Sequence, residues 1–325
     1  MQHYRVSPYR SSDKGVWDAF VLKSNQDTFL FFRDFMDYHS DRFNDFSLMI
    51  YANERLVALL PANKVDNVLY SHQGLSYGGL IYNDDLKTLR YIEIFKSILE
   101  FLNENQVDQL YLKELPFVYH KNSTNNPLAY ICFKLRAKLQ RTDMLSVIDK
   151  NFKKFSSSRK EGLKRGQKHE LSVKEVDSFE LFWNSILIPN LKSKHGVKPL
   201  HSLDEIKLLK SKFPYNIRQF NAYHLNGIVA GVTVFENEQV VHCQYISGTD
   251  NRSELGSLDF LHVHLVEEVF AHKSFFSFGT SNTDQGQFIN KGLQFWKEGF
   301  GARSITQNFY SIETINYSKL EDVVK

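Results

Sequence analysis

The pattern of apolar and polar positions predicts alternating strands and helices, most clearly between residues 239 and 312. There an apolar run at 240–246 is followed by a polar, glycine-containing turn at 247–256. Leucines then recur at helical spacing, and a short apolar run at 274–278 leads into a loop of hydrogen-bonding side chains. A strand, polar turn, helix and strand in this order place backbone N–H groups at a helix N-terminus, where they can hold an anion or a carbonyl oxygen.

The same order of elements is predicted in both halves of the chain. In the first half we expect strands at 3–8, 46–51, 55–62, 65–70, 108–115 and 130–139, and helices through 16–21, 29–43 and 86–102. In the second half we expect strands at 171–176, 217–223 and 228–235 and helices through 179–186 and 203–209, followed by the stretch described above. Trp17 and Trp183 lie 166 residues apart, as do Gln109 and Phe275, and Asn53 and Asn226 lie 173 apart, so the offset drifts by only a few residues. We interpret this agreement as two copies of one domain.

Strand connectivity within each copy predicts the fold class. Strands that follow one another directly should pair antiparallel, whereas the helix before the late strand allows a parallel, right-handed crossover. We therefore predict an α+β fold in which each domain is a mixed, mostly antiparallel sheet flanked by helices. The expected division is a first domain at 1–148, a basic helical connector at 149–170 and a second domain at 171–325.

The segment between the two copies is strongly basic. From Lys153 to Lys168 it contains seven basic residues and one acid, Glu161, whereas the whole chain has a net charge of only +3. Charge this concentrated is typical of a phosphate-binding surface, but a solvated linker helix would have the same composition. Gly162 and Gly166 each weaken a helix by roughly 1 kcal/mol, so we expect this helix to pack on a neighbour.

Composition excludes several classes of protein. A chain of 325 residues with 42% hydrophobic and 14% aromatic residues is long and apolar enough for two packed domains and is not a disordered polymer. Cys132 and Cys243 lie in apolar runs, as buried free thiols in a reducing compartment would. The N-terminus does not resemble a signal peptide, and no run reaches the ~18 apolar residues of a membrane span. We therefore expect a cytoplasmic protein with no transmembrane segment, which leaves peripheral membrane association open.

Three features together resemble a known family. They are the tandem repeat, the basic stretch at 158–173, and a closing pattern of Phe-Ser-Phe-Gly at 276–279, Asn-Lys-Gly-Leu at 290–293 and Trp-Lys-Glu-Gly-Phe-Gly-Ala at 296–302. This combination is similar to the Fem-type (FemAB/FemX-like) aminoacyltransferases of peptidoglycan bridge synthesis, within the wider Gcn5-related N-acetyltransferase (GNAT) fold. The resemblance implies two tandem GNAT-like domains.

The resemblance also implies a reaction, namely acyl transfer to an amine. The donor would be acyl-CoA or aminoacyl-tRNA as co-substrate, and the acceptor an amine of a cell-envelope precursor, an amino sugar or a peptide. The expected partners are therefore a small-molecule or precursor acceptor and, for an aminoacyl donor, tRNA. No metal is expected, because His262 and His264 lie two apart on a predicted helix and so point to different faces.

The loop expected to bind the donor departs from the GNAT pattern. That pattern has Arg or Gln, two residues, Gly, one residue, then Gly or Ala. Here Arg252 precedes Gly256 by one residue too many, and Ser257 stands in place of the second Gly. Together with Ser247 at the end of the preceding strand, these residues are the candidates for binding the donor. The corresponding stretch of the first copy, 74–79, has no basic residue, so we expect the second copy to hold the donor and the first to shape the acceptor pocket.

The reaction requires a positioned neutral amine, a donor to the oxyanion and a path for the proton. His72, between a strand and a glycine-rich turn, is a candidate base or a structural turn residue. Tyr245 at a strand end is a candidate donor to the carbonyl oxygen or ordinary packing. Asp259 in the first turn of a helix is a candidate ammonium ligand or a favourable charge at the helix dipole.

Further candidates for contact with substrate lie in loops and in the basic stretch, where ligand contacts are common. They are Tyr77, Arg159, Lys160, Arg165, Thr280, Ser281 and Asn282. Trp296 and Lys297 are expected to serve packing and the surface, respectively. The alternative to an enzyme is a catalytically inactive tandem module that binds nucleic acid or another anionic polymer through 153–168. The imperfect loop around Arg252 keeps this alternative open.

Overall fold

The computed structural model describes residues 4–122, 126–321 and 323, and the chain forms two compact units. The first unit contains the residues up to Asp143 and those from Thr306 onwards, and the second contains Met144–Ile305. The chain enters the second unit within strand β8 (Lys138–Asp149) and leaves it within β16 (Arg303–Glu313). The units differ from the expected division, because the basic connector belongs to the second unit and the C-terminal residues belong to the first.

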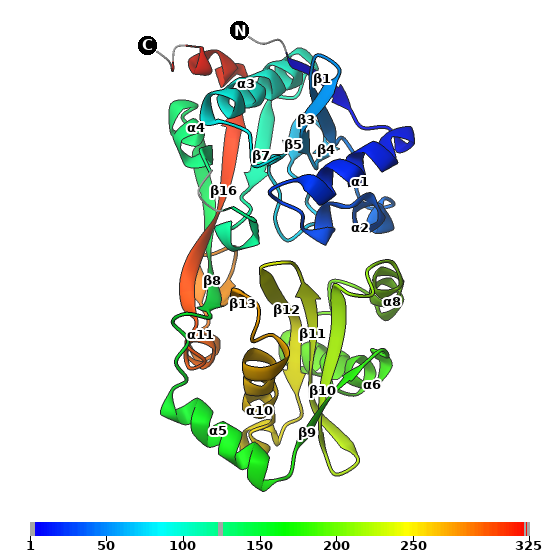
Figure 1. Cartoon of the computed structure of the whole chain (residues 1–325), viewed down its shortest axis with the longest axis vertical. Coiled ribbons are helices and arrows are strands. Elements are labelled where there is room, and N and C mark those ends of the chain that lie inside the picture. The colour runs from blue at the N-terminus through cyan, green and yellow to red at the C-terminus, as the bar shows by residue number, and fades with distance from the viewer. Residues whose placement is uncertain (1–3, 123–125, 322, 324–325) are drawn as a thin grey trace. The chain divides into compact units, whose positions relative to one another are not determined.

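The first unit contains two sheets that are covered by helices (Figure 1). Its strands are β1 (Tyr4–Pro8), β2 (Leu48–Ala52), β3 (Arg55–Leu60), β4 (Asn63–Val65), β5 (Val68–Tyr70), β6 (Ile81–Tyr82) and β7 (Gln109–Lys113). Its helices are η1 (Ser11–Asp13), α1 (Lys14–Lys23), η2 (Phe29–Phe31), α2 (Arg33–Met36), η3 (Asp37–His39), α3 (Thr88–Glu104), η4 (Phe117–Tyr119), α4 (Leu128–Lys134) and η7 (Thr314–Leu320). One sheet has the order β1-β2-β3-β6 and is antiparallel, and the other has the order β4-β5-β7-β16 with β5 parallel to β7.

The core of the first unit forms where α3 packs on these strands. Ile92, Phe95, Leu99 and Leu102 recur at helical spacing and are buried, as their spacing in the sequence predicted. They belong to one cluster with the inward residues of β2, β3 and β7 and with Ile312 of β16. The last strand therefore completes the first unit's core through antiparallel pairing with β7.

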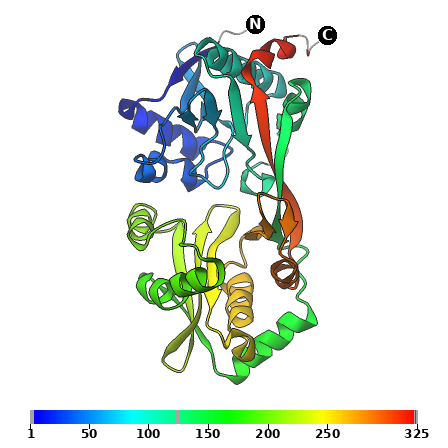
Figure 2. The same cartoon turned by 180° about the vertical axis from the view of Figure 1, so that it is seen from behind.

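The second unit is a single mixed sheet with helices on both faces, seen from opposite sides in Figures 1 and 2. Its sheet has the order β8-β13-β12-β11-β10-β9, from β9 (Ser172–Val176), β10 (Ile217–His224), β11 (Gly227–Glu236), β12 (Val240–Gly248) and β13 (Phe275–Thr280), and a small hairpin adds β14 (Asn282–Thr283) and β15 (Phe288–Ile289). Its helices are α5 (Ser157–Lys168), α6 (Glu180–Phe182), η5 (Trp183–Leu187), α7 (Ile188–His195), α8 (Leu203–Lys212), α9 (Arg252–Leu255), α10 (Ser257–His264), η6 (Leu265–Val269) and α11 (Lys291–Glu298).

Neighbouring residues of β11 show which helices cover which face. Val232 belongs to the same apolar cluster as Leu261 and Leu265, whereas the Thr233 hydroxyl lies 3.4 Å from the indole nitrogen of Trp183. Because successive strand residues point to opposite faces, α10 covers one face and the α6–η5 segment covers the other. The predicted α+β architecture, a mixed and mostly antiparallel sheet flanked by helices in each half, is confirmed.

The basic helix α5 packs directly on α10, as its two glycines suggested. A Cβ atom at Gly162 would lie 1.8 Å from Asp259 Oδ2, and one at Gly166 would lie 2.6 Å from the Cβ of Phe260. Gly256, which has a left-handed backbone (φ 68°), approaches the carbonyl oxygen of Gly162 equally closely. Glycine is therefore required at this crossing because the two backbones touch.

Two expectations for the first half were wrong. The apolar run at 130–139 was expected to be a strand, but α4 ends at Lys134 and β8 begins only at Lys138. Leu128, Ile131 and Leu135 are buried on one face of this helix, and a short apolar run cannot separate that pattern from a strand. The helix expected at 29–43 is broken into the short turns η2, α2 and η3.

The glycine contact predicts a specific loss of stability. We expect Gly162→Ala to destabilise the chain by about 1–3 kcal/mol, because the new methyl group must displace Asp259 or the helix. Urea unfolding followed by circular dichroism measures the change. Gly15→Ala in α1 is the matched control, since its Cβ would meet no atom within 4 Å, and it should stabilise by about 0.5–1 kcal/mol. Equal responses of the two variants would contradict the close packing of α5 on α10.

Candidate functional site

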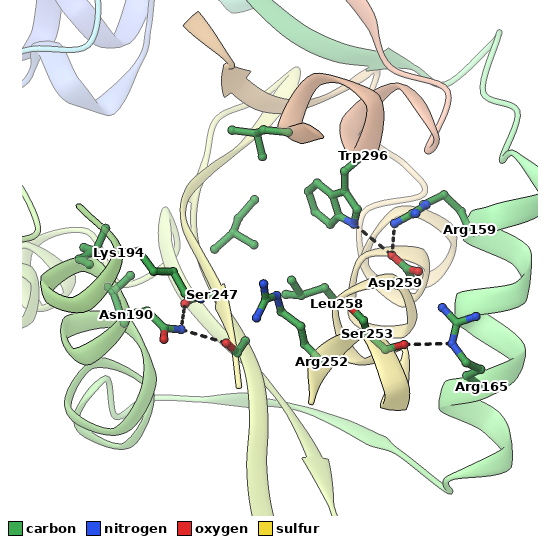
Figure 3. Close-up of a pocket in the computed structure, with 15 residues that line it drawn as sticks. Arg159, Arg165, Asn190, Lys194, Ser247, Arg252, Ser253, Leu258, Asp259 and Trp296 are labelled. Atoms are coloured by element: carbon green, nitrogen blue, oxygen red, sulfur yellow. Dashed lines mark hydrogen bonds and ion pairs between the residues drawn. The ribbon is translucent and has the colours of Figure 1, made fainter. Parts of the chain in front are cut away.

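A cavity of about 440 Å³ lies within the second unit at the C-terminal end of β12 (Figure 3). Helices α5, α7, α9, α10 and α11 contribute to its walls, and Ile246, Ser247 and Gly248 of β12 line it from the sheet. The lining is therefore assembled from segments that are far apart in the sequence.

The cavity begins where two parallel strands separate. Strands β12 and β13 pair only from Val240 with Phe275 to His242 with Ser277, although β12 continues to Gly248. Beyond that point β13 changes direction at Gly279, which has a left-handed backbone (φ 67°). The end of β12 stays paired with β11 on one edge but has no strand partner on the edge toward β13, and its last residues line the cavity.

A side chain from α7 fixes this end of the strand. Asn190 donates from Nδ2 to Ser247 Oγ (2.7 Å) and to the Gly248 carbonyl (2.9 Å). Both bonds are drawn in Figure 3, where Lys194 of the same helix also borders the cavity. The amide therefore satisfies a strand-end carbonyl that no neighbouring strand reaches.

The cavity is electropositive. Four cations line it, Arg159, Arg165, Lys194 and Arg252, and among the described residues of its lining Asp259 is the only acid. Arg165 donates from Nε to the Ser253 carbonyl (3.1 Å), and the guanidinium of Arg252 extends into the cavity in Figure 3. An excess of guanidinium groups around a small cavity favours an anionic ligand.

Asp259 is bound by the protein itself. Its Oδ1 accepts from Arg159 (2.5 Å) and from the Trp296 indole (3.1 Å), while Oδ2 packs against Gly162. Burial raises the pKa of this carboxyl, and the neighbouring Arg159 opposes that shift. Asp259 thus connects Arg159 and Trp296 at the wall of the cavity.

Tyr245 is turned away from the cavity. Its hydroxyl accepts from the His201 backbone (3.1 Å) and lies 2.7 Å from His201 Nδ1, and its ring packs edge-on against Trp183. Burial raises its pKa to about 12. Tyr245 is therefore part of the core beneath α6 and η5, two residues before Ser247, which does line the cavity.

The remaining candidates of the second unit lie outside the cavity lining. Gly256 and Ser257 are buried at the crossing of α5 and α10. Thr280 and Asn282 bond to each other, Asn282 also accepts from the Met144 backbone (2.8 Å), and Ser281 between them is buried. Lys160 is exposed on α5.

His72 and Tyr77 belong to the core of the first unit. His72 is stacked on His39, and burial lowers its pKa to about 3. The Tyr77 hydroxyl lies 2.6 Å from Thr28 Oγ1, and its ring packs against Tyr119. Both side chains are therefore engaged by the unit's own packing.

The parallel strands of the first unit do not open in the same way. After β5 the Ser71 hydroxyl accepts from the Lys113 backbone (2.7 Å), and Gly78 donates to the Lys113 carbonyl (3.1 Å). A Cβ at Gly78 would lie 2.0 Å from the Ser71 carbonyl, so the loop is closely packed. The loop at 71–78 thus closes onto β7 at the position where the second unit has its cavity.

Comparisons with solved structures identify the fold. FemX matches 98% of this chain and 99% of its own, with a TM-score of 0.64 and 10% identity. A tandem GNAT protein from the clavulanic acid biosynthesis pathway matches 96% of this chain and 99% of its own, with a TM-score of 0.51 and 11% identity. This chain has the tandem GNAT fold.

A third solved structure agrees over a smaller part of the chain. The C-terminal domain of a putative lysylphosphatidylglycerol synthetase from Agrobacterium fabrum matches 82% of this chain and 84% of its own, with a TM-score of 0.55 and 14% identity. No protein-family model matches the sequence, and no curated protein matches it. The likeness therefore rests on the arrangement of the backbone.

Sequence reasoning missed three residues that line the cavity. Asn190 and Lys194 line the cavity, and they carry no distinctive signal because the helix that holds them is rich in polar residues. Trp296 was assigned to packing, but its indole borders the cavity. Lys297 was expected at the surface but is buried, donating to the carbonyls of Gly279 and Thr280, and burial lowers its pKa to about 8.

The described residues hold neither a metal-binding cluster nor a membrane-spanning helix. No cluster of three or more His, Cys, Asp or Glu side chains there could hold a metal ion. In the same part of the chain, no helix has the length and apolar character needed to cross a bilayer.

A buried histidine behind the cavity predicts acid sensitivity. His262 donates from Nδ1 to the Leu258 carbonyl (2.7 Å), its ring lies against Trp296, and burial lowers its pKa to about 4. The unfolded chain, with a histidine pKa near 6.5, binds this proton more readily. Stability is therefore complete above about pH 6.5 and falls between pH 6.5 and 4, by up to roughly 3 kcal/mol from this residue.

Urea unfolding at pH 7, 6, 5 and 4, conditions chosen to span this window, measures the effect. We expect His262→Phe to lose less stability on acidification than the natural chain, because it has no proton to gain. His272, which is exposed and belongs to the same unit, supplies the control, His272→Phe. Parallel pH profiles for the natural chain and His262→Phe would contradict the neutral, buried state of His262.

Proposed function

We propose that this chain is an N-acyltransferase that moves an acyl group from a phosphate-bearing donor to an amine. The donor is acyl-CoA or an aminoacyl-tRNA, and the acceptor is an amine of a cell-envelope precursor, an amino sugar or a peptide. The observation that carries the proposal is the cationic cavity at the point where β12 and β13 separate. The fold shared with FemX and a tandem GNAT protein supports acyl transfer in general.

The cavity has the composition that such a donor requires. Its guanidinium groups can neutralise phosphate oxygens, and its volume lies in the range of small-molecule sites. Its apolar surface can hold the uncharged part of the donor, and it comes from Leu187, Leu191, Ile246, Leu258 and Leu293. A lining that combines cations with apolar side chains can contact both the anionic and the uncharged parts of the donor.

The chemistry needs few protein groups. The lone pair of a neutral amine attacks the acyl carbon, the C–N bond forms, and the C–S or C–O bond to the donor breaks. The amine loses a proton, and the leaving thiolate or alkoxide gains one. Ser247, which accepts a bond from Asn190, can donate its own hydroxyl proton to the carbonyl oxygen as negative charge develops there.

The residues can then be given proposed roles. Arg165, Lys194 and Arg252 bind the anionic part of the donor, Ser247 polarises the acyl carbonyl, and Asp259 positions Arg159 and Trp296 at the wall. We expect the reaction to take place in the cytoplasm, where both kinds of donor are made.

Replacing one cation tests the proposal. We expect Arg252→Gln to weaken donor binding about 10- to 100-fold, because a charge-assisted hydrogen bond contributes about 1.5–3 kcal/mol. Isothermal titration with acyl-CoA and with aminoacyl-tRNA measures binding, and mass spectrometry of reactions with amino sugars and peptides detects the acylated amine.

The matched control is Arg303→Gln, an exposed arginine of the same unit that does not line the cavity. It should bind the donor like the natural chain. If neither donor binds the natural chain, or if both variants lose affinity equally, the cavity is not the donor site.

A further inference from the structure

The basic helix α5 presents different cations on its two sides. Arg159 and Arg165 face α10 and the cavity, where they contact Asp259 and the Ser253 carbonyl. Lys160, Lys164 and Lys168 are exposed instead. We infer that this lysine row, defined as Lys160, Lys164 and Lys168, is a docking surface for the phosphate backbone of a nucleic acid.

The geometry of the row suits a linear polyanion. The three lysines follow one another at intervals of four residues, so they lie on one side of the helix. With a rise of about 1.5 Å per residue, neighbouring lysines are about 6 Å apart along the axis. A straight row of flexible ammonium groups can contact successive phosphates without reading the bases.

The lysine row is destabilising in the protein alone. Like charges four residues apart repel each other on a helix. Among the described residues no acidic side chain forms an ion pair with any of the three lysines, although Glu161 and Glu170 are exposed nearby. Contact with α10 explains Gly162 and Gly166, but the lysine row has no such contact. Because these three lysines form no ion pair within the described part of the chain, an external anion would account for their arrangement.

A nucleic acid fits the surface better than a membrane does. A helix that lies in a bilayer interface needs apolar side chains beside its lysines. The only large apolar residue of α5 is Leu163, which packs against the core of the second unit. The outer face therefore offers charge without apolar contact, as backbone binding by counterion release requires.

Arg159 and Arg165 belong to the same helix but face the cavity, so they are not part of the lysine row. The inference concerns the exposed surface alone and does not depend on acyl transfer, so nucleic-acid binding can fail while donor binding succeeds, or the reverse.

Fluorescence anisotropy with labelled RNA and DNA of equal length, single-stranded and duplex, tests the inference between roughly 50 and 200 mM salt. The test variant combines Lys160→Gln, Lys164→Gln and Lys168→Gln, which keeps helix propensity close to that of lysine. We expect the slope of log affinity against log salt to become shallower by about 2–3, since each phosphate contact contributes about 0.7–0.9.

The control combines Lys23→Gln, Lys87→Gln and Lys138→Gln, which are exposed lysines of the first unit with the same total charge change. It should keep the natural slope, and circular dichroism should show equal helix content in both triple variants. Equal loss in the two would mean that only net charge matters and would overturn the inference. Binding to anionic phosphatidylglycerol vesicles but to neither RNA nor DNA, abolished by the test variant, would overturn it in favour of a membrane.

Discussion

The crossing of α5 and α10 is the contact on which the cavity depends. Gly162 lies against Asp259, and the carbonyl of Gly162 meets Gly256, so the helices approach as closely as their backbones allow. This distance lets Arg159 reach Asp259 and Arg165 reach the Ser253 carbonyl. Two of the four cations of the cavity therefore owe their positions to glycine packing. Any change that separates the helices removes charge from the cavity at the same time.

Each unit has an equivalent pair of parallel strands, β5 and β7 in the first and β12 and β13 in the second, and the two pairs end differently. In the second unit the pair ends at His242 and Ser277, and the strand end beyond it is held open by Asn190. In the first unit the loop after β5 returns to β7 through bonds that involve Ser71, Gly78 and Lys113. One repeated architecture thus yields an open strand end in one unit and a closed one in the other.

Local patterns in the sequence predicted much of the fold because they report on local physics. The helical spacing of Ile92, Phe95 and Leu99 predicted α3, and Gly162 and Gly166 indicated that α5 must pack on a neighbour. The run at 130–139 was wrongly predicted to be a strand, because its buried face covers only two turns of helix before β8 begins. Residues 306–325 belong to the first unit because β16 pairs with β7. No local pattern in the sequence predicts a pairing between strands so far apart in the chain.

The candidate site was predicted in part for the same reason. Arg159, Arg165, Ser247 and Arg252 stood out by charge or by position at a strand end, and they line one cavity. Asn190 and Lys194 come from a helix that reaches the cavity only through folding. Tyr245 shows the limit most clearly. It lies two residues before Ser247, yet its hydroxyl bonds to His201 in the core. The two side chains differ in the helical residues that they meet, because Tyr245 packs against Trp183 whereas Ser247 bonds to Asn190.

The division of cations on α5 follows from the different chemistry of arginine and lysine. A guanidinium keeps its charge when it is partly buried and can donate to a carboxylate while presenting other N–H groups to a ligand. A buried ammonium does not keep its charge so firmly, and burial lowers the pKa of Lys297 in the same unit to about 8. Arginine at 159 and 165 therefore suits the partly buried wall of the cavity, where each guanidinium also bonds to the protein. Lysine suffices on the outer face, where water already solvates the charge and a phosphate has only to displace counterions.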